Sequence, residues 1–224
     1  MRSVNGEPVP IAMELGELEQ RMASSDMQIF AASCQALALA NTQEAYELLR
    51  EYVCVSDPYR RRCVLAVIFD YEQAVELKSE LVAALRSEKH FLVTTALDQI
   101  VSGKAMVEEE ELFGCIERNH NSLSGYYYGA LMNVQKTAGN LDRILRLYHS
   151  SKENSIRTAL AQCLQGFCNS ENYLLLFDLF KDEPVSHIRM VACRIAKAYG
   201  RGDLLRDFAD DRDGHIRKLV SCGI

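Results

Sequence analysis

A short motif recurs about every 30 residues, and this periodicity constrains the fold more than any other feature of the chain. Residues 186–189 read Ser-His-Ile-Arg and residues 214–217 read Gly-His-Ile-Arg, and each segment follows an acidic turn. A third copy, Asn-Ser-Ile-Arg, ends at Arg157, which lies 32 residues before Arg189; Arg217 follows 28 residues later. A repeat of this length is typical of stacked helix pairs, because one pair cannot bury its own apolar face and needs its neighbours.

Weaker copies extend the register into the N-terminal half. Each copy has one anchor position, and four residues after it stands a small side chain, which would let a neighbouring helix approach closely. Apolar residues precede most anchors, with Arg61 and Gly125 as exceptions. The anchors are Phe30, Arg62, Leu92, Tyr126, Arg157, Arg189 and Arg217, and the small residues are Cys34, Ala66, Ala96, Ala130, Ala161, Cys193 and Ser221.

Amphipathic stretches with helical spacing lie between the anchors, for example at 141–148 and 174–180. Asp26, Asp57 with Pro58, and Asp182 with Pro184 resemble capping residues at helix starts. No spaced run of alternating β-branched residues is present, so an all-β fold is excluded. The pattern predicts a single all-α domain of helix pairs, each with a first helix, a tight turn and a second helix. The repeats span roughly 11–40, 41–71, 72–102, 105–137, 139–167, 170–199 and 201–224.

These features resemble HEAT repeats, and more narrowly the short HEAT-like repeats of bacterial proteins and phycobilisome lyases. Asp211 and Arg217 have the six-residue Asp/Arg spacing of HEAT units, and Glu183 with Arg189 matches with Glu in place of Asp. The resemblance covers nearly the whole chain and is strongest over residues 150–224. It implies a right-handed α-solenoid, an ARM/HEAT-like superhelix of about seven helix pairs, with second helices on the concave side. It most often implies binding of a partner protein.

The anchor Arg residues admit two interpretations. Arg157, Arg189 and Arg217 could form a basic ladder that binds an acidic partner, or a structural ladder tied to the acidic turns. Glu183 and Asp211 lie in those turns, which favours the structural interpretation. Burial of an Arg with a paired carboxylate would support it.

Two triplets depart from the repeat pattern and provide candidates for partner binding, Arg60-Arg61-Arg62 and Tyr126-Tyr127-Tyr128. Tyr and Arg are enriched at interface hot spots, although at most two members of each triplet can face one way. His187 and His215 share one register two residues before an anchor, where a polar helix start is the alternative explanation. The partner-binding candidates are Arg60, Arg62, Tyr126, Tyr127, His187 and His215.

No residue is predicted to be catalytic or to bind a metal or a cofactor. The chain lacks the Walker A, GxGxxG and GxSxG motifs, and its 8 Cys and 5 His show no zinc-site spacing. The net charge of −6 disfavours general binding of nucleic acid, which needs a basic face. The Cys are interpreted as reduced thiols of a cytoplasmic protein; no signal peptide and no run of 18 apolar residues is found.

The sequence therefore favours a non-catalytic, cytoplasmic protein-interaction scaffold that holds a partner protein on its concave face. A specific version is an inhibitor of a basic toxin. A DNA glycosylase of the HEAT-like alkylpurine type is the enzymatic alternative, but those enzymes use a basic face with Trp, and this chain has none. A bilin-lyase-like protein is a third hypothesis.

The last predicted helix bears on the oligomeric state. It runs through Leu219, Val220 and Ile224 and lacks the polar outer face that usually caps a solenoid. We expect it to be frayed or to be buried in a homo-oligomer.

Overall fold

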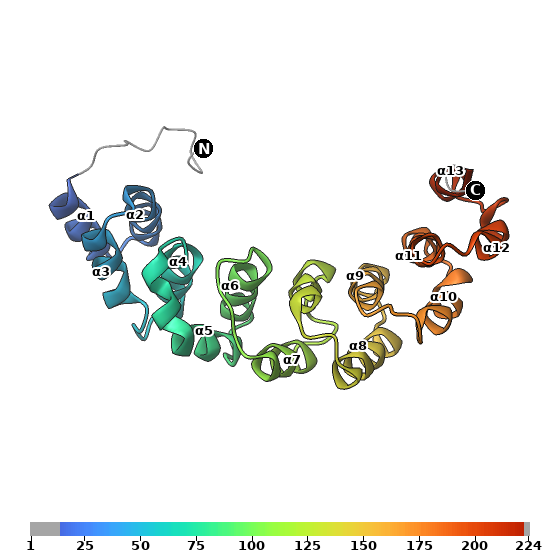
Figure 1. Ribbon diagram of the computed structural model, residues 1–224. Coiled ribbons are helices and arrows are strands. Elements are labelled where there is room, and N and C mark those ends of the chain that lie inside the picture. Colours follow the sequence, from blue (N-terminus) through green and yellow to red (C-terminus); the bar gives the residue numbers. More distant parts are fainter. Residues whose placement is uncertain (1–13, 222–224) are drawn as a thin grey trace. The chain divides into compact units, whose positions relative to one another are not determined.

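The computed structural model describes residues 14–221, and within this part of the chain every regular element is a helix (Figure 1). Cys222 and Ile224 lie outside the described residues. The elements are α1 (Leu15–Met22), α2 (Met27–Ala40), α3 (Gln43–Tyr52), α4 (Pro58–Ile68), η1 (Glu72–Leu77), α5 (Lys78–Leu85), α6 (His90–Val101), α7 (Glu109–Arg118), η2 (Gly125–Asn133), α8 (Ala138–Ser150), α9 (Asn154–Gln165), α10 (Tyr173–Lys181), α11 (Ser186–Ala198), α12 (Gly202–Leu205), η3 (Arg206–Phe208) and α13 (Gly214–Ser221). The predicted all-α class is confirmed.

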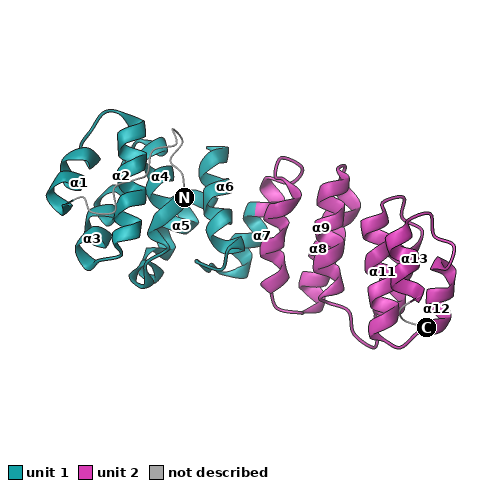
Figure 2. Ribbon diagram, turned by 90° about the horizontal axis from the view of Figure 1, so that it is seen from above, with its two compact units in different colours: residues 1–115 teal, residues 116–224 magenta. Residues whose placement is uncertain are grey.

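The chain divides into two compact units, residues 1–115 and 116–224, and the division falls within α7 (Figure 2). In unit 1, α1 packs on α2, α3 packs on α4, and α5 packs on α6. The second members of these pairs also contact each other in series, α2 with α4 and α4 with α6. We call α2, α4 and α6 the second-helix layer of unit 1.

Unit 2 repeats this arrangement. Helix α8 packs on α9, α10 packs on α11, and α11 also contacts α12 and α13. Its second-helix layer consists of η2, α9, α11 and α13, each of which contacts the next. In each unit the first helices form the other layer, called the first-helix layer of that unit below.

Two of the three predicted helix caps are confirmed. The Asp26 carboxylate accepts hydrogen bonds from the first backbone N–H groups of α2, and Asp57 does the same for α4, with Pro58 as the first helical residue. The third is wrong: α11 begins at Ser186 without a side-chain cap, so Asp182 and Pro184 precede the helix. The acidic turn is used instead by Arg side chains, as described below.

The small residues of the repeat are buried in five of seven copies, at Cys34, Ala96, Ala130, Ala161 and Cys193. In α4 the predicted register is wrong by one residue, because Arg62 and Ala66 are exposed and Val64, Leu65 and Ile68 are buried. Arg61 lies three, four and seven residues before these buried residues, so it shares their face of the helix, and it is partly buried. Ser221 is also exposed, at the end of α13.

The element at anchor Tyr126 is a 3₁₀ helix, not the α-helix expected from the repeat. Two glycines in five residues, Gly125 and Gly129, weaken the α-helical preference. Gly125 also lies directly against the next second helix: a Cβ at this position would stand 2.6 Å from the backbone oxygen of Ser155. Close approach of the backbones explains why this copy lacks the apolar residue that precedes most anchors.

The described part of α13 corrects our expectation for the last helix. Ile216 and Val220 are buried within unit 2, whereas His215, Arg217 and Lys218 are exposed. The helix therefore has a polar outer face over residues 214–221. None of the helices between residues 14 and 221 is both long enough and apolar enough to cross a membrane.

Candidate interaction surface

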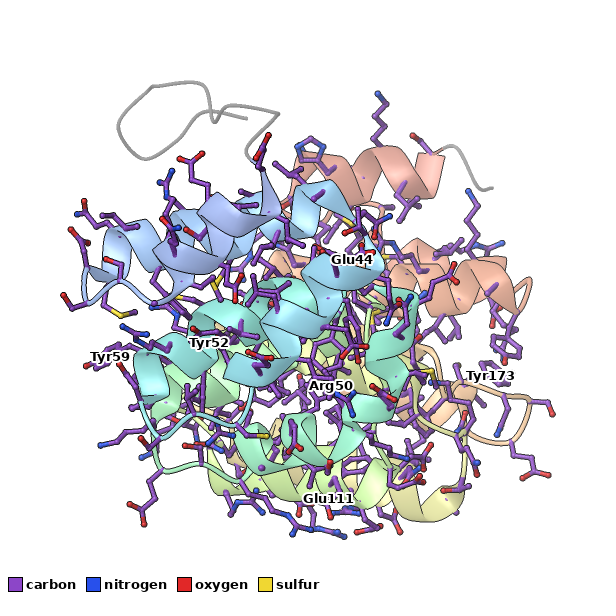
Figure 3. The ribbon with its side chains drawn as sticks, turned by 90° about the vertical axis from the view of Figure 1, so that its left-hand side faces the viewer. Glu44, Arg50, Tyr52, Tyr59, Glu111 and Tyr173 are labelled. Carbon is purple, nitrogen blue, oxygen red and sulfur yellow. The ribbon has the colours of Figure 1, made fainter. Side chains whose placement is uncertain are left out.

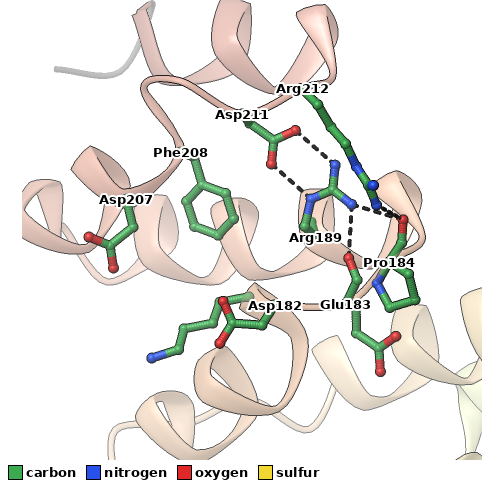
Figure 4. A pocket seen from close by; sticks show the side chains of 9 residues that line it. Asp182, Glu183, Pro184, Arg189, Asp207, Phe208, Asp211 and Arg212 are labelled. Atoms are coloured by element: carbon green, nitrogen blue, oxygen red, sulfur yellow. Dashed lines mark hydrogen bonds and ion pairs between the residues drawn. The ribbon is translucent and has the colours of Figure 1, made fainter.

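Arg189, on α11, is the most completely bonded member of the predicted Arg ladder (Figure 4). It is only 5% exposed, and its Nε and Nη2 atoms donate to the two carboxylate oxygens of Asp211, each at 2.8 Å. Its Nη1 atom donates to the backbone oxygens of Glu183 at 2.8 Å and Pro184 at 3.0 Å. The hydrogen bonds from Arg189 hold the pKa of Asp211 below its usual range. Arg189 thus joins its own turn to the turn before α13.

Arg157, on α9, makes the corresponding link one pair earlier. Its Nη2 atom donates to Glu183 Oε1, which also accepts a 2.6 Å hydrogen bond from the Tyr148 hydroxyl. The Arg157 guanidinium lies 5.2 Å from the centre of the Tyr148 ring. Burial, together with the bond to Glu183, raises the pKa of Tyr148. Arg157 and Arg189 therefore each pair with the acidic turn inside the next helix pair along the chain.

Arg217 repeats only part of this geometry. Its Nη1 atom donates to the backbone oxygen of Asp211, six residues earlier, as Arg189 does to Glu183. Asp213 accepts from the backbone N–H of His215 and so begins α13. Arg217 is exposed.

An open cavity of ≈ 700 Å³ lies beside these turns, between the start of α11 and the loop before α13 (Figure 4). Its charged groups are largely engaged with one another: Arg189 with Asp211, and Lys181 with Asp178 at 2.9 Å. None of the described residues that line it is Ser, Thr, Cys or His. Within residues 14–221, no group of three or more His, Cys, Asp or Glu is arranged to hold a metal ion.

The three Arg of α4 have different environments. Arg60 lies over the Phe30 ring, 4.8 Å from its centre, and donates to the backbone oxygens of Met22 and Ser24. Arg60 therefore contributes to packing within unit 1. Arg62 is the exposed member of the triplet.

An aromatic pair joins α4 to α6, and the sequence pattern did not identify it. Tyr59, on α4, is stacked on Phe91, on α6, with ring centres 4.8 Å apart and an interplanar angle of 15°. Tyr59 nevertheless remains 57% exposed (Figure 3). Because the two helices belong to the second-helix layer, the pair presents an aromatic surface on that layer of unit 1.

The Tyr triplet of η2 divides in a similar way. Tyr128 is fully buried, Tyr127 is partly buried, and Tyr126 is 57% exposed. The rings of Tyr126 and Tyr127 meet edge to face, with centres 5.3 Å apart. His187 and His215 are both exposed, in the first turns of α11 and α13.

A polar network around His120 also escaped the sequence analysis. The Nδ1 atom lies 2.7 Å from the Tyr128 hydroxyl, and Nε2 lies 3.1 Å from the Ser150 hydroxyl. The Tyr128 hydroxyl also accepts from the backbone N–H of Asn121, and the Ser150 hydroxyl also donates to the backbone oxygen of Arg146. Burial lowers the pKa of His120. Asn121, next to His120, is the residue from which a turn here could have been predicted, because Asn favours turns; in the structure it adopts a positive φ of 64°.

The comparisons with known proteins bear on the fold alone. No family model and no curated protein sequence matches the chain. Two crystal structures of engineered proteins from the Northeast Structural Genomics Consortium are similar. One is 14% identical over 91% of this chain, with a TM-score of 0.54, and this chain spans 66% of its length. The other is 12% identical over 94% of each chain, with a TM-score of 0.35. The first likeness agrees with an all-helical fold.

Proposed function

We propose that the chain is a non-catalytic, HEAT-like scaffold that binds a partner protein through its second-helix layer. In this proposal the two units form one right-handed α-solenoid of about seven helix pairs, and the second-helix layer is the concave side. The serial contacts of second helices within each unit support it, as do the paired Arg of the repeats. A cytoplasmic location is part of the same proposal.

One observation carries the proposal. Of the large hydrophobic side chains exposed within residues 14–221, two are aromatic, Tyr59 and Tyr126, and both lie on second helices. Exposed aromatic side chains anchor protein interfaces because they contribute a large contact area for the loss of few rotatable bonds. Arg62, one turn from Tyr59, adds an exposed guanidinium to the same helix.

Position-dependent crosslinking tests the proposal. The photoreactive residue p-benzoylphenylalanine replaces Tyr59 or Tyr126 in the tagged chain, and the matched control carries it at Val75, which is 82% exposed on η1 of the first-helix layer. We expect one partner to be crosslinked from Tyr59 and from Tyr126, to be displaced by untagged protein, and not to be crosslinked from Val75. Equal crosslinking from all three positions, or none, would refute a second-helix interface.

The glycosylase alternative is favoured by one observation. Asp98 is the single acidic residue of the second helices between residues 27 and 221; burial raises its pKa, and attraction from Arg62 opposes that rise. An acidic residue with an Arg nearby matches part of the general pattern of that class. Release of an alkylated base from DNA by the purified chain, abolished by Asp98→Asn, would establish this activity and displace the scaffold proposal.

A further inference from the structure

Charge is segregated between the two helix layers. In unit 2, η2, α9, α11 and α13 together contain 42 residues with no Asp or Glu, although 31 of the 224 residues of the chain are acidic. The same four helices carry six Lys and Arg. Acidic residues dominate the first helices of unit 1, with eight acidic and three basic residues in α1, α3, η1 and α5. The first helices of unit 2, which are α8, α10, α12 and η3, carry four of each sign. The net charge of −6 therefore conceals a basic layer.

Part of this positive charge is neutralised within unit 2. Arg157 pairs with Glu183, and Arg189 is buried with Asp211. The remaining cations are exposed and comprise Arg194 and Lys197 on α11 and Arg217 and Lys218 on α13. Within residues 14–221, no ion pair involves any of these four side chains.

The exposed groups of α11 follow one ridge. His187, Arg194 and Lys197 are exposed, Met190 between them is partly buried, and the four are three or four residues apart and so share a helix face. The opposite face is buried. Ten residues of helix span roughly 15 Å. Helix α13 packs beside α11 and adds Lys218 to the same layer.

We propose that this surface, called the basic ridge and formed by His187, Arg194, Lys197, His215 and Lys218, binds an acidic segment of the partner protein. The inference rests on the proposed function and specifies the chemistry of its partner. It also argues against a basic toxin as the partner, because the second helices of unit 2 carry no Asp or Glu for such a toxin to bind. A ridge of about 15 Å accommodates some ten residues of a helix rich in Asp and Glu.

Charge balance favours a protein segment over nucleic acid. Proteins that bind duplex DNA commonly make about six to ten phosphate contacts. The ridge offers only three permanent positive charges, on Arg194, Lys197 and Lys218. A short acidic segment requires only a few ion pairs.

Fluorescence anisotropy with a labelled peptide of ten Glu tests the proposal, with a peptide of ten Gln and a ten-nucleotide single-stranded DNA as comparison probes. We expect the Glu peptide to bind the full chain, and to bind more weakly as salt rises, because exposed charges are screened. The double variant Arg194→Glu/Lys218→Glu should weaken this binding at least about tenfold. Arg194→Gln/Lys218→Gln should produce a smaller loss.

The matched control is Arg146→Glu/Arg206→Glu, which makes the same change in net charge at exposed positions of the first-helix layer in unit 2. It should retain most of the peptide affinity. Far-UV circular dichroism and urea midpoints show whether both double variants remain folded. No binding of the Glu peptide, equal weakening by the two double variants, or tighter binding of DNA through Arg194 and Lys218 would overturn the proposal.

The result can be separated from that of the crosslinking experiment. Crosslinks from Tyr59 and Tyr126 without peptide binding would retain the scaffold and reject an acidic partner. Peptide binding that depends on Arg194 and Lys218, without any crosslinked partner, would retain the ridge and reject an interface that includes the two Tyr.

Discussion

The buried pair of Arg189 and Asp211 provides the sharpest test of the interpretation of the ladder. We predict that Arg189→Met strongly destabilises the protein. The substitution keeps an unbranched apolar stem but removes all four hydrogen bonds of the guanidinium, two to the carboxylate and two to backbone oxygens. The Asp211 side chain, only 7% exposed, then loses its cation.

The expected magnitude follows from burial. Removal of one partner from a buried ion pair typically costs about 3–5 kcal/mol, because the remaining charge is left uncompensated. Arg217→Met is the control, since Arg217 is exposed and makes one backbone contact; its cost should stay within about 1 kcal/mol. Asp211→Asn combined with Arg189→Met removes the orphaned charge and keeps an acceptor for the backbone N–H of Asp213. The double variant should therefore be more stable than Arg189→Met alone, by about 1–2 kcal/mol.

Urea denaturation measures these differences in free energy of unfolding. Far-UV circular dichroism reports helix content and Tyr fluorescence reports packing, since the chain has no Trp. Coincident curves from the two probes would justify a two-state analysis. A loss of less than about 1 kcal/mol for Arg189→Met, or a double variant as unstable as the sum of the single variants, would refute a structural ladder.

Three further predictions concern other parts of the chain. Gly125→Ala should lower the urea midpoint by the equivalent of about 1–3 kcal/mol, because the added Cβ would clash with the backbone of Ser155. The control Gly139→Ala, whose Cβ would have no atom within 4 Å, should raise the midpoint slightly. Equal effects of the two substitutions would contradict this account. Burial lowers the pKa of His120, so below about pH 6.5 the unfolded chain binds more protons than the folded protein does. The melting temperature should therefore fall as the pH is lowered from 7.5 to 5.5, and it should fall less in the variant His120→Gln. The same dependence of melting temperature on pH in both proteins would contradict this prediction. Burial raises the pKa of Cys163 to about 12, so mass spectrometry after native alkylation should find exposed Cys54 modified well before Cys163, and equal rates would disprove the packing.

The repeat and its helices could be predicted from the sequence because the apolar spacing repeats throughout the chain. The orientation of individual side chains could not always be predicted. In the triplet at 60–62 three identical residues occupy successive positions, so composition does not distinguish which one faces inward. The structure places Arg60 over Phe30 and leaves Arg62 exposed, because the cap at Asp57 determines where the helix starts.

The acidic turns illustrate a second limit. Asp182 and Pro184 resemble a helix start because such residues commonly occur there. In the structure this turn instead accepts hydrogen bonds from Arg side chains. Arg157, 26 residues before Glu183, bonds to its carboxylate, and Arg189, six residues after it, bonds to its backbone oxygen. The longer link depends on how neighbouring helix pairs stack. Charge segregation could have been counted from the sequence. The net charge alone indicates an acidic protein. A basic surface is recognised only once the second helices of a unit are known to lie in one layer.

The direction of the Arg–carboxylate links has a consequence for the growing chain. Arg157 precedes Glu183 in the sequence and Arg189 precedes Asp211, so during synthesis each guanidinium leaves the ribosome before the carboxylate that neutralises it. A chain that ends after α11 would contain Arg189 with no Asp211, whereas a chain that begins at α11 would lack neither member of that pair. A cut between the two members of a link leaves one charge without its partner from either side: loss of the carboxyl-terminal part leaves Arg157 without Glu183, and loss of the amino-terminal part leaves Glu183 without Arg157. Each link therefore makes one helix pair depend on the next for the neutralisation of a buried charge.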